Sequence, residues 1–291
     1  MAKSALQKEK SRTALLFGIP ALLFVFLLLG IPILQSIYYS MTKWNGLSTH
    51  WIGPSTYIKE FSNPIFWRVM QNNALLLLSV PVAILIPMGI AFLLNEHVYG
   101  WRFFRSVYFL PTAISWVVIG MVSLRFFAQE GLLNGLLKGI GLGFIRTDLL
   151  SSERGALAAV AITFIWSMVG TNIMIFLTGM ANLEISLNEA GRLDGANNFQ
   201  IFLHITIPQL KRFIQFSFVI TIISAFTALF SLIFVMTGGG PGFGTTTLEF
   251  FVYQSAFAKG DFGTGAMLGL ILFVIMAGLG VAQLALTKSK D

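Results

Sequence analysis

The sequence predicts an all-α, polytopic membrane protein with six transmembrane helices, and three observations support this fold class. Hydrophobic residues make up 56% of the 291 positions and charged residues only 11%, with a mean hydropathy of +0.79, which excludes an ordinary water-soluble domain. A spanning helix needs about 20 apolar residues, and six charge-free runs meet or approach that length. Because backbone polar groups in lipid must be satisfied internally, these runs are expected to be helices. The runs are 13–42, 69–95, 106–124, 155–183, 213–248 and 262–287.

Each of the first three runs contains proline, which membrane helices tolerate and which can bend their axes. The prolines are Pro20 and Pro32 in the first run, Pro81 and Pro87 in the second, and Pro111 in the third. We expect 13–68 to form the first transmembrane helix with an outer loop, and 69–287 to form a membrane core that includes a polar loop at 182–212. Residues 1–12 and 288–291 are expected to be tails.

The fourth and fifth runs contain polar groups, and a glycine-rich outer turn at 237–244 leads towards the sixth run. Trp166, Thr171 and Asn172 lie near the middle of the fourth run. Four hydroxyl residues of the fifth run are separated by four, three and seven positions, which places them on one face of a helix. They are Ser217, Thr221, Ser224 and Ser231.

The charge distribution indicates how the chain is oriented in a lipid bilayer. The formal net charge is +7, but the basic residues are scattered at the ends of apolar runs and form no surface for nucleic acid. They are most concentrated in the N-terminal tail, near Arg102 and Arg105, and around Arg192, Lys211 and Arg212. The positive-inside rule therefore predicts that both termini and the 182–212 loop lie in the cytoplasm.

Several kinds of chemistry are missing from the sequence. No Gly-x-x-x-x-Gly-Lys-Ser/Thr motif occurs, and His50, His97 and His204 are isolated from one another and from carboxylate clusters. With no cysteine and no nucleophile beside a base, we expect no catalytic residue, metal or cofactor. The spans also lack the central charges that mark ion paths in carriers driven by protons or sodium. Their absence argues against a carrier driven by protons or sodium, so a transporter of this kind would take its energy from outside this chain.

The 182–212 loop has the pattern of two short helices. Leu183, Ile185, Leu187 and Leu193 alternate with polar residues, which predicts a short amphipathic helix. Asp194 and Gly195 then predict a turn, because glycine tolerates positive φ and aspartate can cap a second helix. We expect that second helix to continue until Pro208 breaks or bends it.

The loop contains the pattern Glu189-Ala190-x-x-x-Asp194-Gly195-Ala196, followed by Phe202, Ile205, Pro208 and Leu210. This pattern resembles the EAA loop found in the permeases of type I ABC importers. Gly191 replaces the usual second alanine, and Arg212 stands where a proline is common. The residues to which the resemblance gives an ATPase-coupling role are Glu189, Ala190, Gly191, Asp194, Gly195 and Ala196.

Nearly the whole chain resembles the maltose-type, carbohydrate-uptake branch of these permeases. The resemblance implies a type I importer fold in a prokaryotic inner membrane. It also implies three kinds of protein partner: a second related permease, two cytoplasmic ATPase subunits and an extracytoplasmic solute-binding protein. The implied substrate is a sugar or oligosaccharide. A glycerol-phosphate-type substrate is an alternative that would require a basic pathway group, for which Arg125 is the nearest candidate.

Hydroxyl, amide and aromatic side chains in the fourth and fifth runs suit a sugar, which presents hydroxyl groups and an apolar ring face. The candidate pathway residues are Trp166, Thr171, Asn172, Thr221, Ser224 and Thr227. The alternative is that these groups join helix to helix, since such side chains often do so in membranes. Two further functions stay open: a self-contained carrier or channel, distinguished by transport without ATPase subunits, and a membrane enzyme, distinguished by activity without partners.

Overall fold

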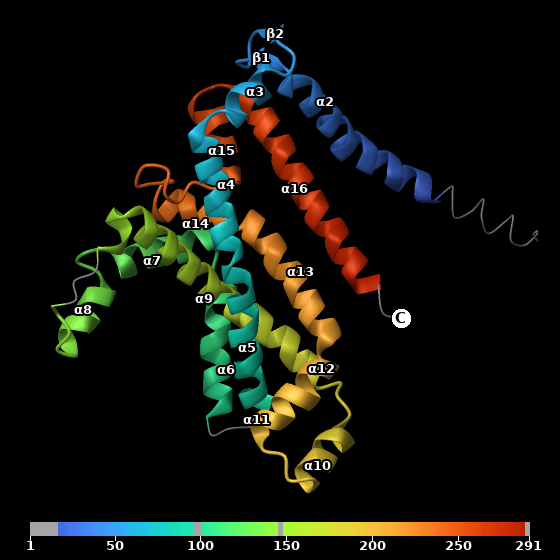
Figure 1. Cartoon of the computed structure of the whole chain (residues 1–291), viewed down its shortest axis with the longest axis vertical. Coiled ribbons are helices and arrows are strands. Elements are labelled where there is room, and N and C mark those ends of the chain that lie inside the picture. Colours follow the sequence, from blue (N-terminus) through green and yellow to red (C-terminus); the bar gives the residue numbers. More distant parts are fainter. Residues whose placement is uncertain (1–16, 96–99, 145–147, 289–291) are drawn as a thin grey trace, which may run out of the picture. The chain divides into compact units, whose positions relative to one another are not determined.

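A computed structural model (Figure 1) describes residues 17–95, 100–144 and 148–288. The chain divides into two compact units. Unit 1 combines the chain up to Ser62 with Val252–Ile275, and unit 2 combines Asn63–Phe251 with the chain from Met276. The predicted tail at 1–12 lies outside the described residues, and so does the predicted tail at 288–291 apart from Lys288, which is the last residue of α16 (Phe262–Lys288).

Unit 1 begins with an apolar helix over Phe17–Ser40, which includes the π-helical turn η1 (Phe26–Gly30) and α2 (Ile31–Ser40). Its other elements are β1 (Thr42–Trp44), β2 (Thr49–Trp51), α3 (Ser55–Phe61), the π-helical turn η5 (Gln254–Ala258) and the first part of α16 (Phe262–Lys288). No side chain in the most apolar stretch of the first helix is buried, which suits a helix that faces lipid.

The short hairpin β1–β2 departs from the all-helical prediction. Thr42 pairs with Trp51 and Trp44 with Thr49 in antiparallel register, and β-branched and aromatic residues favour that conformation. Asn45 closes the connection, since its Oδ1 accepts from the backbone N–H groups of Leu47 and Ser48.

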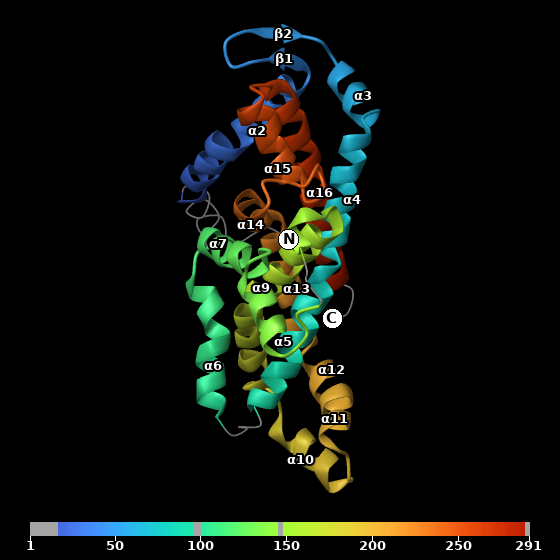
Figure 2. The ribbon, with the colours of Figure 1, turned by 90° about the vertical axis from the view of Figure 1, so that its left-hand side faces the viewer.

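Unit 2 holds most of the helices, which Figure 2 shows from a second direction. In chain order they are α4 (Pro64–Leu77), α5 (Ser79–Asn95), α6 (Trp101–Phe109), η2 (Leu110–Ala113), α7 (Trp116–Phe127), α8 (Leu132–Gly139), η3 (Leu149–Ser151), α9 (Glu153–Met180), α10 (Ile185–Leu193), α11 (Asn198–Ile201), η4 (Phe202–Thr206), α12 (Ile207–Gln209), α13 (Lys211–Thr227), α14 (Leu229–Met236) and α15 (Leu248–Tyr253), the last of which continues into unit 1.

Within the described residues, five helices are long and apolar enough to cross a membrane, and a bent pair makes a sixth candidate. The five are Phe17–Ser40, Pro64–Asn95, Glu153–Met180, Lys211–Met236 and Phe262–Gln283. The third predicted run, 106–124, is the bent pair: Ser106–Ala113 and Trp116–Phe127 meet at 112°. Pro111 cannot continue the hydrogen-bond ladder, and Ser115 is extended and caps α7 by accepting from the Val118 N–H.

The core of unit 2 forms where α9 packs against α5 and α13. Phe164, Ile173 and Phe176 of α9 are fully buried. On another side of α9, Gly170 permits close approach to α6 and η2, since a Cβ at this position would lie 2.5 Å from the Tyr108 carbonyl oxygen. The long central helix α9 therefore fixes the positions of its neighbours.

Candidate functional site

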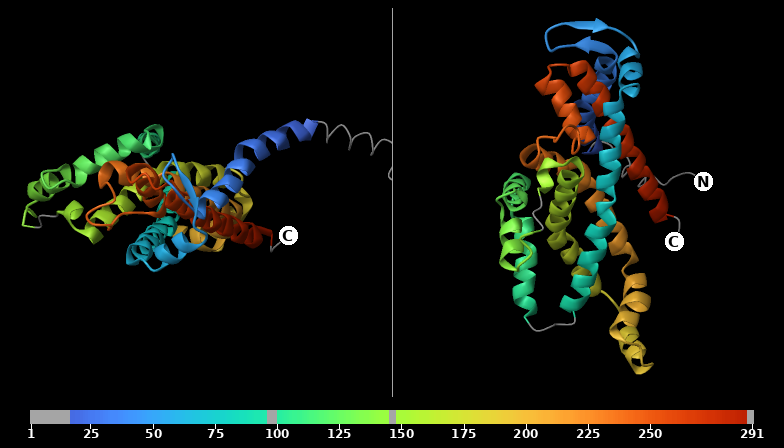
Figure 3. Two further views of the ribbon diagram at one scale, coloured as in Figure 1. Left: turned by 90° about the horizontal axis from the view of Figure 1, so that it is seen from above. Right: turned by 60° about the vertical axis from the view of Figure 1, so that its left-hand side comes forward.

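The 182–212 loop folds as the predicted helix–turn–helix at one end of unit 2, where Figure 3 shows α10 to α12 in the yellow-gold part of the chain. α10 ends in a Schellman turn: the Ala196 N–H donates to the Gly191 carbonyl at 2.9 Å, and the Gly195 N–H donates to the Arg192 carbonyl. Gly195 has a φ of +82°, which only glycine adopts without cost.

The cap of the second helix differs from the prediction. Asp194 is the C-cap of α10, whereas Asn197 is the N-cap of α11. The Asn197 side chain accepts from the Gln200 N–H at 2.9 Å, and the Gln200 side chain accepts from the Asn197 N–H at 2.8 Å, forming a capping box. The helix continues through the π-helical turn η4 and ends close to Pro208, as predicted.

The turn exposes both acidic and apolar side chains. Glu189 and Asp194 are exposed, and so are Leu193 at 88% and Phe199 at 69%. Gly191 faces η4, since a Cβ there would lie 2.7 Å from the end of the Ile205 side chain. A cavity of about 340 Å³ opens beside the turn, and its lining is Asp194, Gly195, Ala196, Gln200, His204 and Ile205. Such a surface offers carboxylates, an apolar rim and a recess to a protein partner.

Two of the six candidate pathway residues, Asn172 and Thr221, meet in a buried polar junction. The Asn172 Nδ2 donates to Thr221 Oγ1 at 3.2 Å, and Ser217 Oγ donates to Asn172 Oδ1 at 2.8 Å. All three side chains are fully buried. The junction thereby joins α9 to α13. This is the helix-to-helix bonding that the sequence offered as the alternative to lining a substrate pathway.

The same Asn172 side chain also joins α9 to α5 through a carbonyl that a proline leaves unpaired. Pro87 lies inside α5 and has no N–H to donate to the carbonyl of Ala83, four residues earlier. Asn172 Nδ2 donates to that Ala83 carbonyl at 2.7 Å. The asparagine therefore repairs the ladder of α5 from a neighbouring helix, as membrane helices with proline require.

The other four candidate pathway residues are more accessible. Trp166 is 40% exposed, and Thr171 and Ser224 are half-buried. Thr227 is exposed, and its hydroxyl donates to the Ile223 carbonyl within its own helix. Whether these residues line a pathway stays a prediction.

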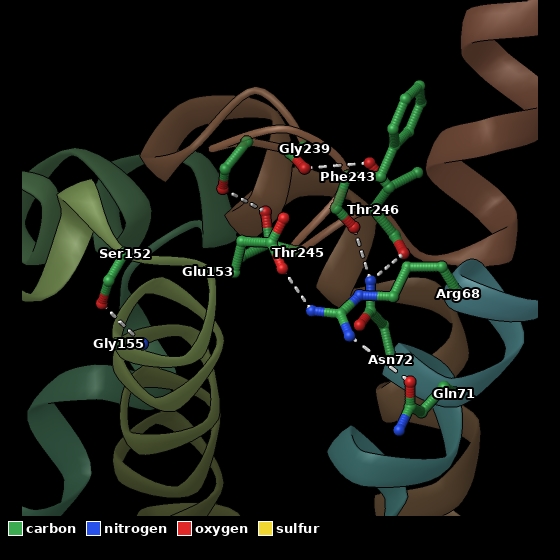
Figure 4. Close-up of polar contacts among 11 residues, drawn as sticks. Arg68, Gln71, Asn72, Ser152, Glu153, Gly155, Gly239, Phe243, Thr245 and Thr246 are labelled. Atoms are coloured by element: carbon green, nitrogen blue, oxygen red, sulfur yellow. Dashed lines mark hydrogen bonds and ion pairs between the residues drawn. The ribbon is translucent and has the colours of Figure 1, made fainter. Parts of the chain in front are cut away.

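A second polar cluster, which the sequence reasoning missed, ties α4 to the glycine-rich loop 237–247 (Figure 4). The Asn72 Nδ2 donates to the carbonyl oxygens of Phe243 at 2.7 Å and Thr246 at 2.9 Å. The adjacent Asn73 accepts from the Leu248 N–H at 2.7 Å through its Oδ1. The paired asparagines at the start of the second apolar run were the only sequence signal for this contact.

The N-terminus of α9 joins the same cluster. Arg68 of α4 forms an ion pair with Glu153, the first residue of α9 (Figure 4). Loop 237–247 lies directly on Glu153: a Cβ at Gly244 would meet the Glu153 Cβ at 2.6 Å and its Cα at 2.8 Å. Helices α4 and α9 and the loop thus meet at one point.

We expect Gly244→Ala to destabilise this meeting point, because the added methyl group collides with the backbone of α9 and not with a movable side-chain end. Overpacking of this kind costs about 1–3 kcal/mol. Gly89→Ala in α5 is the matched control, since a methyl group there meets open space. Thermal unfolding of the purified variants in detergent checks the difference, and equal melting temperatures would show that the loop does not rest on Glu153.

The fold and loop define a multi-pass helical membrane protein with an exposed helix–turn–helix between its fourth and fifth apolar runs. Residues 60–290 match the family described as binding-protein-dependent transport system inner membrane component. The chain belongs to this family. The match confirms the family resemblance of the 189–210 segment and the predicted location in the inner membrane.

Relatives and solved structures agree with this assignment. The chain is 34% identical to a probable ABC transporter permease of Pyrococcus horikoshii over 90% of each chain, and 34% identical to the probable ABC transporter permease YurN of Bacillus subtilis over 94% of this chain and 95% of the relative. It is 30% identical to the multiple sugar-binding transport system permease MsmF of Streptococcus mutans, over 88% and 89%. A bacterial ABC transporter that imports alginate has the same fold, with a TM-score of 0.81, 21% identity, and coverage of 99% of this chain and 100% of that one.

Proposed function

We propose that this chain is one of two permease subunits of a type I ABC importer that carries a sugar or oligosaccharide into a prokaryotic cell. The single observation behind the proposal is the exposed turn at Glu189–Ala196, which belongs to an importer-family chain that has no P-loop motif of its own. The substrate class is supported by MsmF, a relative named for multiple-sugar transport.

The proposed partners are a second related permease, two ATPase subunits and an extracytoplasmic solute-binding protein. A solved structure with a TM-score of 0.82 and 20% identity to this chain is a bacterial alginate transporter in complex with a periplasmic protein that holds an alginate pentasaccharide. The basic residues near the 182–212 loop favour a cytoplasmic position for it, which is where an ATPase would bind. Both termini would lie on that same side.

The loop would transmit nucleotide-driven motion to the helices. α10 docks in the ATPase through exposed Glu189 and the apolar rim, while the Schellman turn and capping box keep α10 and α11 at a fixed angle. Closure of the ATPase dimer then pulls on α12 and α13, which follow directly in the chain. If the two packed states of the permease differ by only a few kcal/mol in free energy, binding of ligand and nucleotide is sufficient to shift the population from one state to the other.

Reconstitution tests the proposal. Proteoliposomes that contain this chain with its companion permease, ATPase subunits and binding protein should accumulate sugar only when ATP is present. Omission of the ATPase should stop uptake. Accumulation by this chain alone would assign it to the self-contained carriers instead.

Trp166→Ala tests whether the exposed indole of α9 lines the pathway. Stacking of a sugar ring on an aromatic side chain is lost in this variant, so we expect the KM for uptake to rise by several-fold while the assembled complex persists. Phe216→Ala is the matched control, because Phe216 is an aromatic residue of α13 with 54% exposure that was not assigned to the pathway. Equal uptake kinetics in wild type and Trp166→Ala would remove Trp166 from the pathway.

A further inference from the structure

Glu249 is a buried carboxyl group to which the proposed function gives no role. It lies in the first turn of α15, directly after loop 237–247. Both of its carboxyl oxygens are buried and lack a hydrogen-bond partner among the described residues. The same is true of Thr247 Oγ1 and of Asn72 Oδ1, so unsatisfied oxygens gather where the loop meets α4.

Among the described residues, the hydrogen-bond donors at this junction do not pair with the Glu249 oxygens. The Asn72 amide nitrogen donates to two loop carbonyls, and neither the Thr247 hydroxyl nor the Asn73 amide forms a hydrogen bond with Glu249. An ionised Glu249 would add two more acceptor oxygens. A protonated Glu249 would instead supply an O–H donor at a junction where Asn72 Oδ1 and Thr247 Oγ1 lack a hydrogen-bond partner among the described residues.

The charges around Glu249 do not stabilise its ionised form. In α4 the ionisable residue is Arg68, which is paired with Glu153. α14 packs beside Glu249, since its Phe230 and Phe234 contact the neighbouring Phe250. Neither α14 nor loop 237–247 contains an ionisable residue. The remaining ionisable groups of the adjoining segments are Arg154 in α9 and Tyr253 in α15.

Burial therefore controls the titration of this carboxyl group. Desolvation raises the pKa of Glu249 from 4.5 to about 7, while Thr247 and Asn73 oppose the rise without forming well-aligned hydrogen bonds. Because the folded form prefers the proton, the stabilising effect is complete below pH 4.5 and is lost as the pH rises towards 7.

We propose that Glu249 is a proton-binding site whose occupancy holds loop 237–247 against α4. With the proton bound, the neutral carboxyl group stays in the junction beside Thr247 and Asn73. When the O–H bond breaks, the proton passes to water and the carboxylate must be hydrated, which opens the junction. The loop carries the contacts to Asn72 and Glu153, so release at Glu249 loosens the point where α4 and α9 meet.

Infrared difference spectroscopy tests the proton site directly, in the full complex reconstituted in lipid. A titration from pH 5 to 9 should show the loss of a protonated-carboxyl carbonyl band near pH 7 in the wild type, and Glu249→Gln should lack this band. Glu130→Gln, at an exposed carboxylate, is the matched control and should keep it. A spectrum unchanged by Glu249→Gln would overturn the proposal.

Cysteine labelling tests the effect on the loop, because the natural chain contains no cysteine to interfere. A single Phe243→Cys variant should react faster with a thiol reagent above pH 7 than the same variant combined with Glu249→Gln, and at equal rates below pH 6. Taking the ratio of the two rates at each pH cancels the reactivity of the thiol itself. A ratio that is constant across this range would show that the proton does not hold the loop.

Stability measurements guard against a trivial folding defect. Glu249→Gln mimics the protonated form and should fold as well as the wild type at low pH. Above pH 7 the unfolding equilibrium constant of Glu249→Gln should be lower than that of the wild type, by at most about 300-fold. This factor corresponds to the rise in the pKa of Glu249 from 4.5 to about 7 on folding. Lower stability of Glu249→Gln at every pH would contradict the assignment.

Discussion

Glu189→Lys is expected to abolish ATP-driven uptake while the membrane fold and the assembly of the two permeases persist. Glu189 is exposed on α10, so its replacement removes no internal contact of importance to folding. In the proposed docked interface, however, the change would place a cation where we expect the Glu189 carboxylate to pair with the ATPase. Loss of a buried charge pair costs about 2–5 kcal/mol, so the affinity for the ATPase subunit should fall by at least about 30-fold.

Glu184→Lys provides the matched control for this prediction. Glu184 is also exposed, precedes the same helix, and undergoes the same charge change. We expect it to retain most of the uptake. Measurement of uptake and ATP hydrolysis in proteoliposomes separates the two variants, and equal uptake by Glu189→Lys and wild type would exclude α10 as the coupling helix.

Asn172→Ala is expected to destabilise unit 2 and to be partly rescued by Pro87→Ala. The first change leaves the Ala83 carbonyl and the hydroxyls of Ser217 and Thr221 without partners. Interhelical hydrogen bonds in membranes average about 0.6 kcal/mol each, so the combined loss should be about 1–3 kcal/mol. Pro87→Ala restores an N–H that can donate to the Ala83 carbonyl within α5.

A double-mutant cycle measures the rescue. Pro87→Ala should stabilise the Asn172→Ala background more than the wild type, by about 0.5–1 kcal/mol, because the two donors compete for one acceptor. Pro81→Ala is the control, since Pro81 lies in the first turn of α5, where its missing N–H breaks no bond of that helix, and Asn172 donates to the Ala83 carbonyl. Strict additivity of Asn172→Ala and Pro87→Ala in thermal unfolding would show that Asn172 does not repair the proline gap.

The fold was largely predictable because the requirements of lipid are simple. Long charge-free runs have to be helices, and five of the six predicted runs are long, apolar helices. The bend in the third run depends on Pro111 together with the extended Ser115, and a proline alone does not distinguish a bent helix from a broken one. The β1–β2 hairpin was missed because three-residue strands have too short a pattern to recognise.

The site was predictable where contacts are local in sequence. The turn at Gly195 follows from the ability of glycine to adopt positive φ. The predicted N-cap of the second helix, Asp194, was wrong, because Gly195 and Ala196 complete the Schellman turn and α11 begins only after Asn197. Contacts that join distant segments left little signal. The Asn72 contact spans more than 170 positions, and the unsatisfied carboxyl of Glu249 becomes visible only when α4 and the loop are placed together.

The most direct test of the central claim places a single cysteine at Leu193, whose side chain is 88% exposed at the end of α10. If the 182–212 loop is the segment through which a separate ATPase binds and drives this permease, Leu193→Cys should cross-link to an ATPase subunit in membrane vesicles. It should also resist a membrane-impermeant thiol reagent added outside intact cells. Rapid labelling from outside, with no cross-link to an ATPase, would contradict the account.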